Sequence, residues 1–411
     1  MLQIIVLYDR IKKTKRGCVM LKKIFCVLTV VLIIASVCGC ANNVDAPADS
    51  SVAVESSEPE KVIIPPVING NSLSDYTIVY RAMNNATQTD ACRDSGLVNV
   101  IRKYFKETYG EVVKAAPDSA TESEKEIILG KIASREISKG DETEYGYGGY
   151  KVVISGDKIW ISGDYATGIY QGFEALTEMF NESEDGVFTD TEFSGEGEVI
   201  KVAAIGDSIT IGVNSNDYEK TYPTYIQQML GYDYYVANLG VNGSSICTID
   251  PYSYAKFREY TIAKMLKPDV VLFALGTNDA NPGAHTPSKD WTNPANNRVE
   301  VFKRDTKAMW DTFKSLNPDV QIFVILPASL IDCPAGQKWD PVNWTLNIVE
   351  YSHPLLKELA EEYSLDTVDM FPWSVENPEV FTDGLHPYKE SYKDFAQYIY
   401  ENIADKIVKP E

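Results

Sequence analysis

Five short apolar runs alternate with helical patterns in the second half of this 411-residue chain. The runs lie at 200–206, 234–239, 269–275, 320–326 and 365–371. The helical patterns lie near 220–231, 253–267, 298–316, 344–363 and 390–407. Apolar runs of this length suit strands that helices cover on both faces of a sheet. The alternation therefore predicts an α/β domain at 198–408 with a doubly wound, five-stranded parallel sheet.

The first apolar run ends in Gly206-Asp207-Ser208. Gly206 permits a sharp turn, which would lift the Ser208 hydroxyl out of the sheet. Open α/β sheets place their ligands at the carboxyl ends of their strands. A polar turn after a core strand would give the same triplet, so its meaning depends on the segments that follow.

Three later segments supply the other groups that ester hydrolysis requires. Gly243 offers a backbone N–H and Asn278 a side-chain amide, each just after a predicted strand. Asp383 lies three residues before His386, a step that lets a carboxylate and an imidazole meet within one turn of backbone. With Ser208 they make a nucleophile, two oxyanion donors, a base and the acid that orients it.

These four blocks resemble those of the SGNH hydrolases, also called the GDSL esterase/lipase family, over residues 198–408. The resemblance implies a flavodoxin-like strand order and a catalytic triad of Ser208, His386 and Asp383. The first block reads GDSIT where the family has GDSL, a conservative apolar exchange.

The resemblance also implies that Gly243 and Asn278 join the Ser208 backbone N–H in an oxyanion hole. The second block reads NLGVNGSS and contains two glycines. Gly243 is aligned with the family's oxyanion glycine because it lies five residues after Asn238, and Gly240 is the alternative.

Residues 1–40 resemble a bacterial lipoprotein signal in which translation starts at Met20. Two lysines precede the apolar segment Ile24–Val37, and Gly39-Cys40 closes the pattern. The resemblance implies cleavage before Cys40 and lipidation of this cysteine, which would anchor the protein to the membrane outside the cytoplasm. An uncleaved signal anchor is the alternative.

The chain is acidic, with a formal net charge of −21 at pH 7. This charge argues against nucleic acid as a partner and against a polybasic grip on anionic lipid. Outside the leader, only Cys92, Cys247 and Cys333 remain, too few and too scattered for a disulfide framework or a metal site. We therefore expect free or buried thiols, no metal and no other cofactor; the oligomeric state is not indicated.

Residues 41–73 are rich in Ala, Ser, Asp, Glu and Pro, which predicts a disordered linker. Strand and helix patterns over 74–187 predict a small α+β accessory domain, followed by an acidic connector at 188–198. The accessory domain resembles the N-terminal domain found beside the catalytic barrels of hexosaminidases and related glycosidases. It carries no catalytic motif, so a carbohydrate-binding role and a plain spacer both remain open.

The loops at 280–297 and 328–343 carry Trp291 and Trp339, which could stack on sugar rings or form a local core. With predicted export and a glycosidase-like neighbour, they favour an esterase that removes acyl groups, such as acetyl, from an extracellular carbohydrate. A cell-envelope O-acyltransferase with the same residues and a non-catalytic glycan-binding lipoprotein are the alternatives.

The chain has two histidines besides His386, and neither has a carboxylate at a comparable spacing. His353, in a predicted helix before Pro354, is expected to be structural. His285 lies in the loop after the third strand and could line the substrate cleft.

Overall fold

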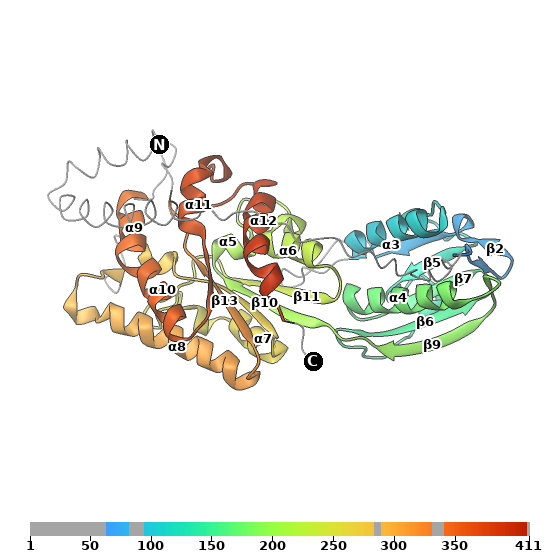
Figure 1. Ribbon diagram of the computed structural model, residues 1–411, viewed down its shortest axis with the longest axis horizontal. Helices are drawn as coiled ribbons and strands as arrows, with labels where there is room; N and C mark the ends of the chain where they lie inside the picture. The colour runs from blue at the N-terminus through green and yellow to red at the C-terminus, as the bar shows by residue number, and fades with distance from the viewer. Residues whose placement is uncertain (1–62, 82–93, 283–288, 331–340, 409–411) are drawn as a thin grey trace, which may run out of the picture. The chain divides into compact units, whose positions relative to one another are not determined.

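The computed structural model describes residues 63–81, 94–282, 289–330 and 341–408 (Figure 1). The predicted leader with Cys40 lies outside these residues, as does the predicted linker up to residue 62. Within the described residues, no helix has both the length and the apolar character needed to cross a membrane.

The second region is built on the parallel sheet that the sequence predicts. Its strands are β10 (Ile200–Gly206), β11 (Tyr234–Gly240), β12 (Val270–Ala274), β13 (Gln321–Leu326) and β14 (Asp366–Asp369). They lie in the order β11-β10-β12-β13-β14, and every neighbouring pair is parallel. This is the flavodoxin-like 2-1-3-4-5 order, so the fold prediction is confirmed.

Helices cover both faces of this sheet (Figure 1). One face packs against α7 (Arg258–Leu266), α8 (Arg298–Leu316) and α10 (His353–Glu362), and the other against α6 (Tyr222–Leu230) and α12 (Ser391–Ile403). Alternate residues of β10 divide between these cores: Ala203 and Ile205 join the first, Val202 and Ala204 the second. A strand buried on both faces must be apolar throughout, which explains its uninterrupted run.

The helix predicted at 344–363 is divided into three segments: α9 (Pro341–Asn347), the π-helical turn η8 (Ile348–Ser352) and α10. Pro354, near the start of α10, lacks a backbone N–H, so a regular α-helical ladder cannot run through it. A shorter helix, α11 (Met370–Glu376), follows β14 and is capped by the Asp369 carboxylate.

The first region contains a six-stranded mixed sheet and two long helices. The strands, in sheet order, are β4 (Lys114–Pro117), β3 (Thr77–Tyr80), β5 (Glu126–Leu129), β7 (Lys158–Ser162), β6 (Gly149–Ser155) and β9 (Thr191–Glu196). The helices are α3 (Asp94–Tyr109) and α4 (Ala166–Glu182). Ile127 and Leu129 share a core with both helices, whereas Ile128 and Trp160 form a smaller cluster with Val79 and Ile132.

The structure contains strands in two segments that the sequence analysis predicts as a connector and a linker. The connector predicted at 188–198 contains β9, which pairs antiparallel with β6 and forms an edge strand. The segment predicted as a linker at 41–73 contains β1 (Val67–Ile68), which pairs with β2 (Asn71–Ser72) and β8 (Val187–Phe188). Ile68 and Leu73 are fully buried, but two-residue strands are too short to give a periodic signal.

Candidate active site

Ser208 lies where β10 passes into the short helix α5 (Ser208–Ile211). Asp207 caps this helix, because its carboxylate accepts the Ile209 N–H at 3.0 Å. A Cβ at position 206 would lie 1.8 Å from the Thr210 Oγ1, so only glycine fits the turn. The sequence thus holds the Ser208 side chain at the carboxyl end of an inner strand, where 5% of the residue remains exposed.

The structure brings Ser208, His386 and Asp383 together. His386 Nε2 lies 2.9 Å from Ser208 Oγ, although 178 positions separate the two residues. On the other side of the ring, His386 Nδ1 lies 2.8 Å from Asp383 Oδ2. With a proton on Nδ1 that is donated to the carboxylate, Nε2 is the nitrogen that can accept the proton of the serine hydroxyl.

Asp383 is bound from several directions. Its Oδ1 accepts the backbone N–H groups of Leu385 at 2.9 Å and His386 at 2.7 Å. Its Oδ2 also accepts the Asn214 amide at 2.8 Å. Burial raises the pKa of Asp383, but the hydrogen bonds, led by that from the His386 ring, hold it well below its usual range. The carboxylate is therefore ionised at neutral pH.

Sequence reasoning did not identify Asn214, which lies 169 positions before Asp383. Its backbone is left-handed, with φ of 69°, a conformation that asparagine tolerates better than most residues. Its carbonyl also accepts the Lys389 N–H at 3.1 Å, so this turn is tied to the loop after His386. An asparagine in a loop gave no signal that it would contact the triad.

The Asn278 side chain is directed toward Asp207, the residue before Ser208. It lies in the 3-10 turn η5 (Asn278–Ala280) after β12, and its Nδ2 donates to Asp207 Oδ2 at 3.2 Å. An amide carries two N–H groups, so one hydrogen bond holds it and the other N–H can serve a substrate oxygen. Asn278 is 7% exposed, which leaves it little conformational freedom.

Gly243 and Gly240 differ in their surroundings. A Cβ at Gly240 would lie 2.1 Å from the Ile211 backbone nitrogen, so Gly240 allows α5 to pack closely against β11. Gly243 has φ of 75° and open space around the missing Cβ. No acceptor for its N–H is found among the described residues. These surroundings favour Gly243 over Gly240 as an oxyanion donor.

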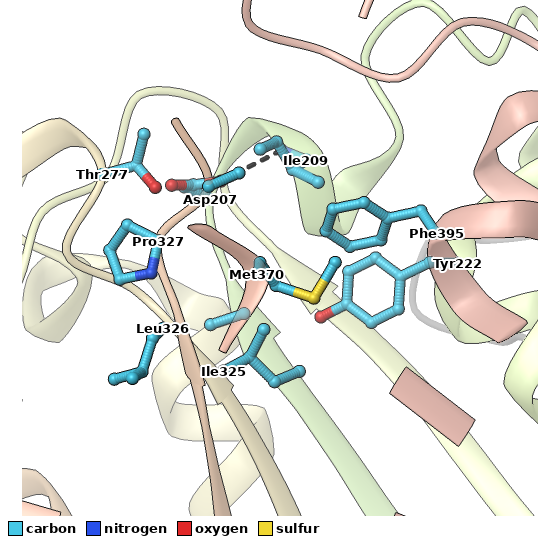
Figure 2. A pocket seen from close by; sticks show the side chains of 11 residues that line it. Asp207, Ile209, Tyr222, Thr277, Ile325, Leu326, Pro327, Met370 and Phe395 are labelled. Carbon is cyan, nitrogen blue, oxygen red and sulfur yellow. Dashed lines mark hydrogen bonds between the residues drawn. The ribbon is translucent and has the colours of Figure 1, made fainter. Parts of the chain in front are cut away.

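Figure 2 shows a small cavity beside Asp207, with the oxygens of Asp207 and Thr277 close together. The cavity has a volume of about 20 Å³, which is enough for about one water molecule. The lining residues are Asp207, Ile209, Tyr222, Ala274, Thr277, Ile325, Leu326, Pro327, Ala328, Met370 and Phe395. Neither Ser208 nor His386 lines it, so this cavity belongs to the core and is not a substrate pocket.

Asp207 is 2% exposed, and its burial raises its pKa to about 6. The Ile209 N–H and the His386 charge lower the pKa, and the Asp279 charge raises it. The pKa values of Asp207 and Asp383 are thus shifted in opposite directions from their usual values.

A buried ionic cluster lies next to the Asn278 turn. Ligand atoms of Cys247, Asp250 and Asp279 lie within 4.8 Å of one another, a spacing that a metal ion could use. Arg298 already supplies a positive charge to this cluster, with two hydrogen bonds of 2.9 Å to the Asp250 carboxylate and a 3.6 Å ion pair with Asp279. Burial also raises the pKa of the Cys247 thiol, which disfavours the thiolate that metals bind.

Trp291 and His353 both have side-chain partners in the structure. Trp291 is 7% exposed and stacks on Tyr351, with ring centroids 4.9 Å apart, so it forms a local core and not a sugar platform. His353 Nε2 lies 2.9 Å from Asp369 Oδ1, a partner 16 positions away that sequence reasoning missed. His285 and Trp339 lie outside the described residues.

Parts of this chain are similar to known proteins. Residues 204–393 match the GDSL-like Lipase/Acylhydrolase family. An acetylxylan esterase from Xylanibacter ruminicola is 28% identical over 257 residues, 59% of this chain and 50% of the relative, so the match spans about half of that protein.

The chain is also similar to solved structures. A lipase/acylhydrolase from Enterococcus faecalis is 18% identical with a TM-score of 0.39, covering 52% of this chain and 100% of the other. A carbohydrate acetylesterase family member from Sinorhizobium meliloti is 21% identical with a TM-score of 0.37, covering 49% and 96%. By the family match, residues 204–393 of this chain form a GDSL-like lipase/acylhydrolase domain.

Proposed function

We propose that this protein is a serine ester hydrolase. The observation that carries the proposal is the continuous hydrogen-bonded chain from Ser208 through His386 to Asp383, with heavy-atom distances of 2.9 and 2.8 Å. These distances lie within the range that proton transfer requires. The membership of residues 204–393 in a lipase/acylhydrolase family supports the same chemistry.

In this mechanism, Ser208 Oγ attacks the ester carbonyl while His386 Nε2 takes the hydroxyl proton. The tetrahedral intermediate collapses when the imidazolium gives that proton to the leaving alcohol, and an acyl-enzyme remains. Water then attacks the acyl-enzyme with His386 as the base, which restores the serine. Asp383 stays ionised and stabilises the imidazolium in both steps.

The negative charge on the carbonyl oxygen would be stabilised by three donors: the backbone N–H groups of Ser208 and Gly243, and the Asn278 amide. Ser208 is the first residue of α5, so its N–H has no partner within the helix. Asp207 would hold the Asn278 amide in place through the 3.2 Å hydrogen bond. Donors that are already oriented need no reorganisation during the reaction.

The substrate that we propose is an acetyl ester on an extracellular carbohydrate. The relative from Xylanibacter ruminicola, an acetylxylan esterase, supports this choice. The leader pattern ending at Cys40 supports export and lipid anchoring, which would place the enzyme near polysaccharides. Incorporation of labelled fatty acid, and its loss in Cys40→Ser, would test the anchor.

Labelling with a fluorophosphonate, followed by peptide mass spectrometry, tests the proposed function. We expect the label on Ser208 and acetate release from acetylated xylan, both abolished in Ser208→Ala. Addition of an unacetylated glycan tests for transfer, because an O-acyltransferase would acetylate it faster than it releases acetate. An intact wild-type protein that neither takes the label nor releases acetate would contradict the proposal and leave glycan binding as the alternative.

A further inference from the structure

We propose that Asp279 is a positioning residue that sets the geometry of the oxyanion hole. It joins the Asn278 turn, residues 277–280, to the Gly243 loop, residues 241–253. The inference rests on the proposed function, because it takes Asn278 and Gly243 as oxyanion donors. The two segments follow different strands, β12 and β11, so they need a connection to keep a fixed separation.

The Asp279 carboxylate provides this connection. It follows Asn278 directly in sequence and is fully buried. Its Oδ2 accepts the Ile246 N–H at 2.8 Å and its Oδ1 accepts the Cys247 N–H at 3.0 Å. Ile246 and Cys247 lie three and four residues after Gly243 in the same loop. The Asp279 side chain thus connects the backbone segment that carries Asn278 to the one that carries Gly243.

The rest of the Asn278 turn is held through its carbonyl groups. Consecutive carbonyls accept hydrogen bonds from side chains: Thr277 from Trp344 Nε1 at 2.6 Å, Asn278 from Lys289 Nζ at 2.9 Å, Asp279 from Arg298 Nη2 at 3.0 Å and Trp291 Nε1 at 3.1 Å, and Ala280 from Asn347 Nδ2 at 2.9 Å. The turn is therefore fixed in the core, and Asp279 transmits its position to the Gly243 loop.

Arg298 makes a buried carboxylate at this point possible. The Arg298 side chain is fully buried, binds Asp250 through two hydrogen bonds and lies 3.6 Å from Asp279 Oδ1. Burial raises the pKa of Asp279, and the arginine charge with the two N–H groups opposes that rise. An asparagine at 279 would turn one acceptor oxygen into an NH₂ group that faces a backbone N–H.

Asp305 on α8 offers a matched control. Its Oδ2 accepts the Thr248 N–H at 2.6 Å and the Thr248 hydroxyl proton at an O–O distance of 2.8 Å; Thr248 directly follows Cys247 in the same loop. Asp305 is 5% exposed, so it too is a buried carboxylate on a backbone N–H. Asp305 belongs to α8 and not to the Asn278 turn. Asp305→Asn therefore weakens the contact between α8 and the Gly243 loop but leaves the connection through Asp279 unchanged.

The test measures kcat and KM on p-nitrophenyl acetate for the wild type, Asp279→Asn, Asp305→Asn, Asn278→Ala and the Asp279→Asn/Asn278→Ala double variant. We expect Asp279→Asn to lower kcat about 10- to 100-fold with little change in KM, because small displacements of donors weaken transition-state binding. Asp305→Asn should stay within about threefold of the wild type. In the Asn278→Ala background, Asp279→Asn should lower kcat by a much smaller factor than it does in the wild type.

The inference is overturned if Asp279→Asn lowers kcat by the same factor in the wild type and in Asn278→Ala. It is also overturned if Asp279→Asn and Asp305→Asn lower kcat equally. Asp279→Glu keeps the charge and takes the place of Asp279→Asn in the same measurements if the latter does not fold. If neither folds, Asp279 serves the fold alone and the inference fails. A wild type that takes no label at Ser208 and has no activity rejects the proposed function instead.

Discussion

The two halves of the proposed active site are held in place by different means. On the triad half, Asp383 meets His386 across a three-residue step and keeps 18% of its side chain exposed. On the oxyanion half, the Asn278 turn is braced by Asp279 and Arg298, whose side chains are fully buried. The first half is hydrogen-bonded around an acid that stays partly exposed, and the second depends on an ionic cluster in the core.

Because of this difference, the two halves should contribute differently to catalysis and to the stability of the fold. Removing a group on the triad half takes away a reacting atom but leaves few buried groups without partners. Removing a group from the ionic cluster leaves charge in a place that water cannot reach, which is costly to the fold. Substitutions on the two halves should therefore affect kcat and the free energy of unfolding in different proportions.

The largest effect is expected on the triad half. Ser208→Ala and His386→Ala should each lower kcat by about 10⁶-fold, and the double variant should lose no more, because the two residues act as one unit. The melting temperature should remain close to that of the wild type. Steady-state kinetics with thermal unfolding of the same samples checks both expectations, and additive losses would mean that the residues act independently.

The next effect falls on the fold itself. Arg298→Met should lower the free energy of unfolding by about 3 to 5 kcal/mol, because it leaves the Asp250 and Asp279 carboxylates buried without their countercharge. Chemical denaturation measures this change. Lys303→Met, which breaks the more exposed pair with Glu358, serves as the comparison. If both substitutions lower the free energy of unfolding equally, the cluster does not have the stabilising role that we assign to it.

Asn278→Ala should lower kcat by about 100- to 1,000-fold, the usual effect of losing one oxyanion donor. KM should change little, since the donor acts on charge that develops in the transition state. Kinetics on p-nitrophenyl acetate gives both values. A rise in KM at constant kcat would show that Asn278 binds the ground state instead.

Because the pKa of the buried Asp207 carboxyl is raised, we expect the stability of the protein to depend on pH. Its pKa in the folded chain, about 6, lies above its ordinary value of 3.8. The native state therefore holds this proton more tightly than the unfolded chain, so the stabilisation is complete below about pH 4 and is lost as pH rises through 6. Between pH 4 and pH 8, Asp207→Asn should gain roughly 3 kcal/mol relative to the wild type, by urea denaturation at each pH. A difference that does not vary with pH would contradict the raised pKa.

The smallest effect is expected at Asn214. Asn214→Ala removes the 2.8 Å hydrogen bond to Asp383 and should lower kcat about tenfold, as expected for a bond to a charged group. In an Asp383→Asn background, the same substitution should have almost no further effect. A full tenfold loss in that background would place the role of Asn214 elsewhere.

The comparison of the two halves also explains what the sequence could predict. The triad residues lie at strand ends or within three positions of each other, so local patterns identified Ser208, Asp383 and His386. The alternation of apolar runs likewise predicted the sheet, because a doubly covered strand must be apolar along its whole length.

The partners that sequence reasoning missed have no local pattern. Arg298 binds Asp250 across 48 positions, and His353 binds Asp369 across 16. Charged residues on helices and in loops are usually solvated, so nothing in residue type or spacing indicated that Arg298 would be buried. These pairings are produced by the fold and can be recognised only once the chain is folded.

The proposed mechanism requires that Ser208 forms a covalent acyl-enzyme. Acid quenching during turnover of an acetyl ester, followed by peptide mass spectrometry, tests it most directly. We predict one acetyl group on the peptide containing Ser208 that disappears as substrate is consumed and is absent from Ser208→Ala. Active wild-type protein in which the acetyl group never appears on that peptide, or appears on another residue, would contradict the account.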